Sequence, residues 1–172
     1  MKRILLTSGA MLAAALTTPA FAQDSDTADA DGSTTIIQPL TISKDADLSF
    51  GRIVKPSTGT GTVTIADSAD TVSAGSGAVA LTGIATSRAK FTIDGEGAQG
   101  ITITVPADFD LVNGTDTITV TLDADRPASD TLDGTLGGDG TRALNVGGSF
   151  SLPDDAVTGE YTGQFTVTVA YN

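Results

Sequence analysis

The sequence predicts an all-β domain, either a sandwich or a barrel. From residue 34 onward, short segments rich in Thr, Val and Ile follow one another, and many alternate apolar with polar residues. Turn-forming pairs such as Asn113-Gly114 and Asp133-Gly134 separate these segments. No segment repeats apolar residues at the spacing of an amphipathic helix. Many short strands at this spacing favour a sandwich or barrel over alternating strands and helices.

The first 22 residues have the pattern of a secretory signal peptide. Lys2 and Arg3 precede an apolar run that is shorter than the roughly 20 residues needed to span a bilayer. Ala20 and Ala22 then form a cleavage pattern before Gln23. We therefore expect residues 1–22 to be removed. The mature chain, which has no membrane span, should pass through the periplasm to the cell surface or the medium.

An acidic leader, residues 23–33, follows the expected cleavage site. It has no large apolar residue, so we expect it to be disordered. The alternative is calcium binding by its carboxylates, although their spacing does not match the loop of an EF-hand. These carboxylates belong to Asp24, Asp26, Asp29 and Asp31. A solvated linker is the favoured interpretation, because blocks of like charge usually repel and extend.

The remaining residues, 34–172, are enough for one domain. Most of the expected strands carry β-branched residues, which suit the pleated surface of a sheet. In chain order they comprise residues 34–43, 47–54, 61–66, 78–84, 89–94, 100–106, 117–123, 143–152 and 160–171. Further turns are expected at Lys44-Asp45, at Asp94-Gly95 and in residues 137–140.

The composition argues against several classes of function. The formal net charge is −12 and becomes two units more negative once Lys2 and Arg3 are removed, which disfavours nucleic acid and anionic lipid as partners. The chain has no His, the commonest general base, and no Cys to form a disulfide. We therefore expect no catalytic, cofactor-binding or metal-binding residues, and we expect the chain not to be an enzyme.

The chain ends on its most regular strand pattern, in residues 159–172, which we call the closing segment. Its odd-numbered positions are mostly apolar and its even-numbered positions are mostly polar. Burying five of these side chains is worth roughly 1.5–3 kcal/mol each before chain entropy is counted. Such a strand should be paired on both edges, by this chain or by another molecule. The residues expected to carry assembly are Gly159, Tyr161, Gly163, Phe165, Val167, Val169 and Tyr171.

Three stretches, PLTISKDADLSFGRIV, VGGSFSLP and GEYTGQFTVTVAYN, resemble a proteobacterial family of small secreted β-proteins. That family is carried as a domain of unknown function and is often described as fimbrial or pilin-like. The resemblance covers residues 36–172. More distantly, the terminus is similar to chaperone–usher pilins and spore-coat-U-like pilins. Those proteins have a penultimate aromatic residue, here Tyr171, and a glycine at the position of Gly159.

The resemblance to pilins implies an immunoglobulin-like sandwich that lacks its last strand. It implies that a periplasmic chaperone first caps the gap, that an outer-membrane usher takes part in assembly, and that the N-terminal extension of a neighbouring subunit then fills the gap. Several members have a disulfide that this chain lacks. On this basis we expect an immunoglobulin-like or related Greek-key sandwich of about seven to nine strands.

Residues 34–43 are either the strand donated to a neighbour or the first strand of this domain. Pro39 removes a backbone donor, and the apolar residues do not form one clean face. Both interpretations remain open. The apolar residues are Ile36, Ile37, Leu40 and Ile42.

The favoured hypothesis is a non-enzymatic, pilin-like structural subunit of a fibre or cell-surface assembly. Its partners are copies of itself, joined by strand complementation at residues 161–171. The alternative is a self-complete secreted binding module that recognises carbohydrate or protein through its Gly- and Asp-rich loops. A hydrolase is retained only in name, because no residue supports it.

Overall fold

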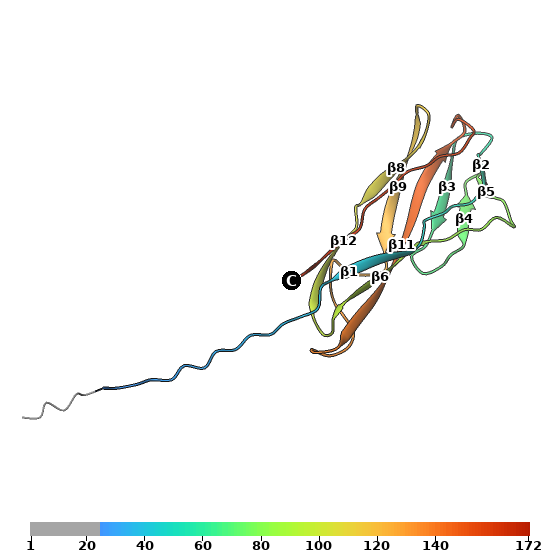
Figure 1. The fold of residues 1–172 in the computed structure, drawn as a ribbon. Helices are drawn as coiled ribbons and strands as arrows, with labels where there is room; N and C mark the ends of the chain where they lie inside the picture. Colours follow the sequence, from blue (N-terminus) through green and yellow to red (C-terminus); the bar gives the residue numbers. More distant parts are fainter. Residues whose placement is uncertain (1–24) are drawn as a thin grey trace, which may run out of the picture. The chain divides into compact units, whose positions relative to one another are not determined.

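A computed structural model describes residues 25–172 (Figure 1). The expected signal peptide, residues 1–22, and the first two leader residues lie outside this range. The chain divides into two units, Met1–Thr34 and Thr35–Asn172. In the first unit, residues 25–34 are exposed and have no regular secondary structure. The second unit is the β-domain.

The β-domain contains twelve strands, all paired antiparallel, and residues 25–172 contain no helix. The prediction of an all-β fold is confirmed, and the arrangement is consistent with a β-sandwich. The strands outnumber the nine expected because β4, β8 and β10 lie outside the expected ranges. The strands are β1 (Thr41–Ala46), β2 (Ile53–Val54), β3 (Thr60–Ile65), β4 (Val72–Gly75), β5 (Val79–Ala80), β6 (Ala89–Glu96), β7 (Gly100–Thr104), β8 (Asp108–Asn113), β9 (Asp116–Ala124), β10 (Ser129–Thr131), β11 (Asp139–Pro153) and β12 (Thr168–Tyr171).

The larger sheet is built around β11, which is 15 residues long. One edge of β11 pairs first with β6, along residues 139–146, and then with β3, along residues 148–153. The neighbour changes at Gly147, where a side chain would collide with the carbonyl oxygen of Ile65. β9 pairs with the opposite edge, and the sheet continues to β1 beyond β6 and to β4 beyond β3.

A smaller sheet and a ribbon complete the domain. The smaller sheet has the order β10–β7–β12, so β12 is an edge strand, and β2 pairs with β5 to form the ribbon. In Figure 1, β12 and the start of β11 lie toward one end of the domain, and the β2–β5 ribbon lies toward the other. Within residues 25–172, no helix is long and apolar enough to cross a membrane.

Two clusters of buried side chains form the core. The strands β6, β7 and β11 supply most of the first cluster, so both sheets contribute to one apolar interior. The first core cluster consists of Ala89, Ile93, Ile101, Ile103, Leu132, Leu144 and Val146. The second core cluster consists of Val63, Ala78, Ile118, Leu152 and Ala156.

The turn predicted at Lys44-Asp45 is wrong, because both residues lie inside β1. The pairing of β1 with β6 shifts register between Lys44 and Ala46, so Asp45 is an extra, bulged residue. Its carboxylate accepts a hydrogen bond from Thr92 Oγ1 at 2.7 Å. Lys44 and Asp45 are polar residues of the kind found in turns, so their composition alone led to the wrong prediction of a turn at this bulge.

The turn predicted at Asp94-Gly95 is also wrong, because both residues lie in β6. Gly95 serves close packing: a side chain there would collide with the hydroxyl of Tyr171. By contrast, the turn at Asn113-Gly114 is confirmed, since Gly114 connects β8 to β9 with a φ of +63°.

Other strand boundaries differ from expectation. The strands β4, β8 and β10 were not predicted, and five predicted strands are shorter than expected. The strands expected over residues 47–54 and 78–84 are reduced to Ile53–Val54 and Val79–Ala80, and the strand expected over residues 100–106 ends at Thr104. The strand expected over residues 34–43 begins only at Thr41, and the strand expected over residues 160–171 is regular only in Thr168–Tyr171.

Candidate functional site

The closing segment follows a single antiparallel neighbour, residues 100–113. Near its beginning, Thr162 and Val112 exchange backbone hydrogen bonds of 2.8 and 3.1 Å. Near its end, β12 pairs with β7 along all four of its residues. Between these points, Gly163 lies so close to the carbonyl oxygen of Asp110 that no side chain would fit. The closing segment is therefore held along one edge.

The other edge of β12 is open within residues 25–172. The backbone N–H of Asn172 donates to the carbonyl oxygen of Gly100 at 3.1 Å. Since alternate residues of an antiparallel pair direct their backbone groups to opposite edges, those of Val169 and Tyr171 point away from β7. Within residues 25–172, β12 pairs with no strand on that side. It therefore presents free N–H and C=O groups, as an edge strand does.

The apolar side chains of the closing segment nevertheless point into the domain. The ring of Phe165 lies 5.1 Å from that of Phe109 and 6.3 Å from that of Phe91, measured between centroids. The alternation seen in the sequence therefore corresponds to an inward and an outward face. The side chains that pack against the first core cluster are Phe165, Val167, Val169 and Tyr171. Tyr161 packs against the second core cluster.

β1 is the first strand of its own domain, and it pairs only with β6. Leu40 and Ile42 pack against the first core cluster. Ile36 and Ile37 belong to neither cluster and are 89% and 39% exposed. The second half of residues 34–43 therefore serves its own domain, whereas the first half pairs with no strand of the described chain.

A groove of about 360 Å³ lies between β1 and the closing segment, and we call it the seam groove. Three aromatic rings, those of Phe91, Phe109 and Phe165, line it together with aliphatic, polar and charged side chains. A groove that is partly apolar and that leads to the unpaired edge of β12 can accept an extended peptide, through backbone hydrogen bonds and side-chain burial together. Its other lining residues are Lys44, Ala46, Asp47, Leu48, Ala89, Leu111, Gly163, Gln164 and Thr166.

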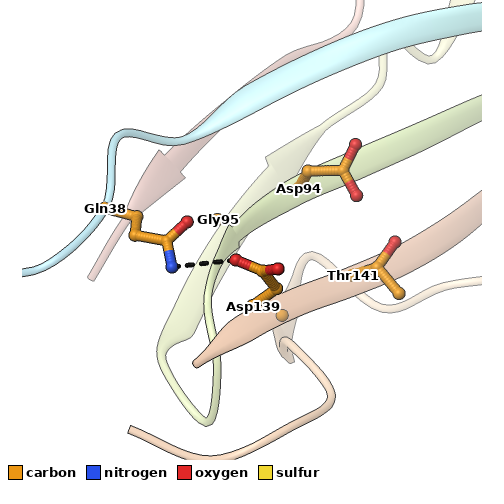
Figure 2. Close-up of a pocket in the computed structure, with 6 residues that line it drawn as sticks. Gln38, Asp94, Gly95, Asp139 and Thr141 are labelled. Carbon is orange, nitrogen blue, oxygen red and sulfur yellow. Dashed lines mark hydrogen bonds between the residues drawn. The ribbon is translucent and has the colours of Figure 1, made fainter. Parts of the chain in front are cut away.

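Gln38 ties the start of the β-domain to its last strand. Its backbone N–H donates to Glu96 Oε2 at 3.2 Å, and its side-chain amide donates to Asp139 Oδ1 at 3.0 Å (Figure 2). The hydroxyl of Tyr171 donates to the Gln38 carbonyl oxygen at 3.0 Å and accepts from the Glu96 backbone N–H at 2.7 Å. Glu96 is only 2% exposed, and its Oε1 accepts from the backbone N–H of Gly137. These contacts, which we call the Gln38 clasp, fix the backbone just before β1.

A second hollow, of about 330 Å³, lies beside the Gln38 clasp (Figure 2). It brings together two carboxylates, Asp94 from β6 and Asp139 from β11, and Thr141 also lines it. In the part of the chain that the structure describes, no group of three or more His, Cys, Asp or Glu side chains is placed to hold a metal ion. The two carboxylates give this end of the domain a negative charge.

The closing segment is also fixed at its beginning. The hydroxyl of Tyr161 donates to a carboxylate oxygen of Asp116 and lies 2.8 Å from the carbonyl oxygen of Val157. The Val157 N–H donates to Asp116 Oδ2 at 3.1 Å. These hydrogen bonds hold the pKa of Asp116 below its usual range, and the bond from Tyr161 has the largest effect. The hydrogen bond to the Asp116 carboxylate in turn raises the pKa of Tyr161. Gly159 has a φ of +152° and packs against the side-chain amide of Asn113.

The residues that sequence reasoning missed come together from distant parts of the chain. Gln38 lies 58 residues from Glu96 and 101 from Asp139, and no local pattern marks such pairs. Phe109 and Leu111 of the seam groove were missed with β8. Their alternation with aspartates was the one signal that could have found them.

The family comparison covers the closing segment up to Tyr171 and the seam groove, but not Gln38 or the residues before it. A model of the family described as "Domain of unknown function (DUF4402)" matches residues 40–171. The match runs from the residue before β1 to the end of β12, so it includes both borders of the seam groove. No curated protein and no solved structure matches the chain significantly.

Proposed function

The chain belongs to the family described as domain of unknown function DUF4402, and we propose that it is a non-enzymatic, pilin-like structural subunit of a fibre or cell-surface assembly. In this proposal the signal peptide expected in residues 1–22 exports the chain, and further copies of the chain are its main partners. Copies join by strand complementation, in which the open edge of the closing segment accepts an extended strand from another molecule.

The observation that carries this proposal is the half-paired state of the closing segment. The backbone of β12 pairs along one edge alone in the described chain, while its apolar side chains pack into the core. An unpaired strand edge is a template for a further strand. Each backbone hydrogen bond gained contributes about 0.5–1.5 kcal/mol net. Covering the three phenylalanines of the seam groove adds a hydrophobic contribution.

The strand proposed to fill the seam groove comes from the residues before Gln38 of another copy. Leu40 and Ile42 are already used in the core of their own domain. Ile36 and Ile37, by contrast, are the exposed large apolar residues next to the Gln38 clasp. Because neighbouring side chains of an extended strand point to opposite faces, one isoleucine enters the groove while the other faces outward.

The seam groove needs cover before assembly. Exposed phenylalanine rings next to an unpaired strand edge are prone to associate with the wrong chain. We therefore propose that a periplasmic chaperone occupies it in transit and that an outer-membrane usher exchanges the chaperone for the next copy, as the resemblance to pilins implies.

The proposal is tested by placing charge on the donor residues. The chain from Gln23 onward should form multimers by light scattering and electron microscopy. The variant Ile36→Asp, Ile37→Asp should stay monomeric with an unchanged urea unfolding midpoint, because it removes the apolar side chain proposed to cover the phenylalanine rings and would bury a carboxylate against them. A matched control, Thr34→Asp, Thr35→Asp, adds the same charge two residues earlier and should still assemble. Unchanged multimers in the isoleucine variant would contradict the proposal, and monomers in all three forms would favour the self-complete binding module.

A further inference from the structure

The outer face of the β2–β5 ribbon is an exposed patch of mixed apolar and cationic character. Val54 pairs directly with Val79, and one step further the Leu81 N–H donates to the Arg52 carbonyl oxygen at 2.9 Å. Val54, Val79 and Leu81 are 47%, 54% and 46% exposed, whereas Ile53 packs inward against the second core cluster. We call Arg52, Val54, Val79 and Leu81 the ribbon patch.

The charge of Arg52 is unmatched within the described chain. The chain is strongly acidic, and most cationic side chains of residues 25–172 lie against a carboxylate. Arg52 and Lys55 form no ion pair with residues 25–172, and Lys55 Nζ instead donates to the Ala156 carbonyl oxygen at 2.9 Å. The cationic residues that do form ion pairs are Lys44, Arg88, Lys90, Arg126 and Arg142.

The opposite character is found beside the Gln38 clasp. Asp94 and Asp139 line one hollow there, and neither forms an ion pair with residues 25–172 (Figure 2). Leu136, in the loop that leads into β11, is 56% exposed. We call Asp94, Asp139 and Leu136 the acidic end. The acidic end combines carboxylates that form no ion pair with one exposed aliphatic side chain. The ribbon patch combines a guanidinium that forms no ion pair with three exposed aliphatic side chains.

These two surfaces lie at opposite ends of one domain. Asp139 is the first residue of β11, whereas Lys55, next to the ribbon, bonds to Ala156 just beyond the end of β11. The 15 residues of β11 span on the order of 45 Å at about 3.3 Å per residue. Figure 1 shows the same separation. One molecule therefore cannot bring its own two surfaces together.

We infer that the ribbon patch of one copy binds the acidic end of a second copy. Arg52 of the first copy lies against Asp94 and Asp139 of the second copy. Leu136 of the second copy covers the aliphatic side chains of the first copy's ribbon patch. Opposite charges across such a contact set which surfaces meet and speed their encounter. Because the two surfaces differ and lie at opposite ends, the contact repeats head to tail from copy to copy and does not close into a two-fold dimer.

This contact also gives a direction to strand complementation, a point that rests on the proposed function. Gln38 lines the hollow at the acidic end, so Ile36 and Ile37 of the second copy begin beside the contact. On the first copy, Ile53 of the ribbon shares the second core cluster with Leu111 and Tyr161, at the beginning of the closing segment. The donated strand therefore enters the seam groove at that end and runs antiparallel to the closing segment.

Charge reversal on each surface tests the inference. Sedimentation velocity of the chain from Gln23 onward is compared for Arg52→Glu, Asp94→Lys and the double variant. Each single substitution should weaken association about tenfold or more, because it places like charges in contact. The double variant should recover most of the loss, and added salt should weaken the wild-type contact. Arg126→Glu, the same charge change outside both surfaces, should associate as the wild type does.

The outcomes separate this inference from the proposed function. If Arg52→Glu and Asp94→Lys leave association unchanged while Ile36→Asp, Ile37→Asp abolishes it, the end-to-end contact is wrong and strand complementation stands. If the charge variants weaken association and the isoleucine variant does not, the contact stands and the donor strand is wrong. Failure of the double variant to recover would overturn the pairing of these two surfaces.

Discussion

The hydroxyl of Tyr171 donates a hydrogen bond of 3.0 Å to the carbonyl oxygen of Gln38, a residue 133 positions earlier in the chain. The same hydroxyl accepts a hydrogen bond from the Glu96 backbone, so the penultimate side chain of the protein is held at two points. This links the backbone before β1 to the last strand. In the proposed assembly, the base of the donor strand and the end of the acceptor strand therefore sit at one end of the domain.

Removing the Tyr171 hydroxyl should loosen both elements at once. In Tyr171→Phe the ring remains, but the partly buried N–H of Glu96 and the Gln38 carbonyl lose their partner. We expect the free energy of unfolding in urea to fall by about 1–3 kcal/mol. Limited proteolysis should also cut faster just before β1. Thr168→Val, at an exposed residue of β12, should change stability by less than about 0.5 kcal/mol, and equal effects of the two variants would contradict the clasp.

Gly95 should not tolerate a side chain. A Cβ there would collide with the Tyr171 hydroxyl and approach Leu132 and Leu40 to 3.0 Å. We expect Gly95→Ala to destabilise the domain by about 1–3 kcal/mol, because the packed interior must shift to admit the methyl group. Gly138→Ala is the matched control, since its nearest neighbour, the Thr135 carbonyl oxygen, lies at an ordinary 3.5 Å. Equal thermal midpoints for both variants would show that β6 and Tyr171 do not pack as described.

The hydrogen bond between Asp116 and Tyr161 should make stability depend on pH. The pKa of Asp116 is lowered on folding, so its contribution is present above the unfolded value of about 3.9 and is lost as pH falls through the folded pKa. The stability difference between the wild type and Asp116→Asn should therefore be largest above about pH 4 and should shrink in more acidic solution.

The same pair makes a prediction at alkaline pH. The pKa of Tyr161 is raised on folding, so its contribution is present below the unfolded value of about 10 and is lost as pH rises through the folded pKa. Tyr161→Phe should abolish this loss of stability at alkaline pH. It should also reduce the fall in stability at acidic pH that is assigned to Asp116. Urea unfolding across the pH range measures both, and a wild type and Tyr161→Phe with parallel pH profiles would contradict the pairing.

The all-β fold was predictable because its signals are local. The Asn113-Gly114 turn needs only a residue that accepts a positive φ, and the alternation of the closing segment marks which of its faces is buried. Alternation says nothing, however, about which edge of a strand is paired, because side chains and backbone groups point in perpendicular directions. The open edge of β12 therefore had to come from the structure.

The errors have a common physical origin. Asp45 and Gly95 have the composition of turn residues, yet one is bulged and the other makes room for Tyr171 from the far end of the chain. The Gln38 clasp and the ribbon patch likewise depend on residues that are distant in sequence. A single sequence carries no record of such contacts, so local composition was misread at these points.

In the proposed assembly, residues 36–37 of one copy occupy the seam groove of another. The chain has no Cys, so an introduced pair can report on this contact alone. Ile36→Cys is combined in turn with Lys44→Cys and with Gln164→Cys, both of which line the groove. The control combines Ile36→Cys with Ser68→Cys, at an exposed residue outside the groove.

The decisive measurement is a non-reducing gel of these variants after mild oxidation. We expect a ladder of disulfide-linked multimers for at least one of the groove pairs, which collapses to monomer on reduction, and no ladder for the control. Disulfides confined to single chains, or ladders of equal strength in the control, would contradict the proposed assembly.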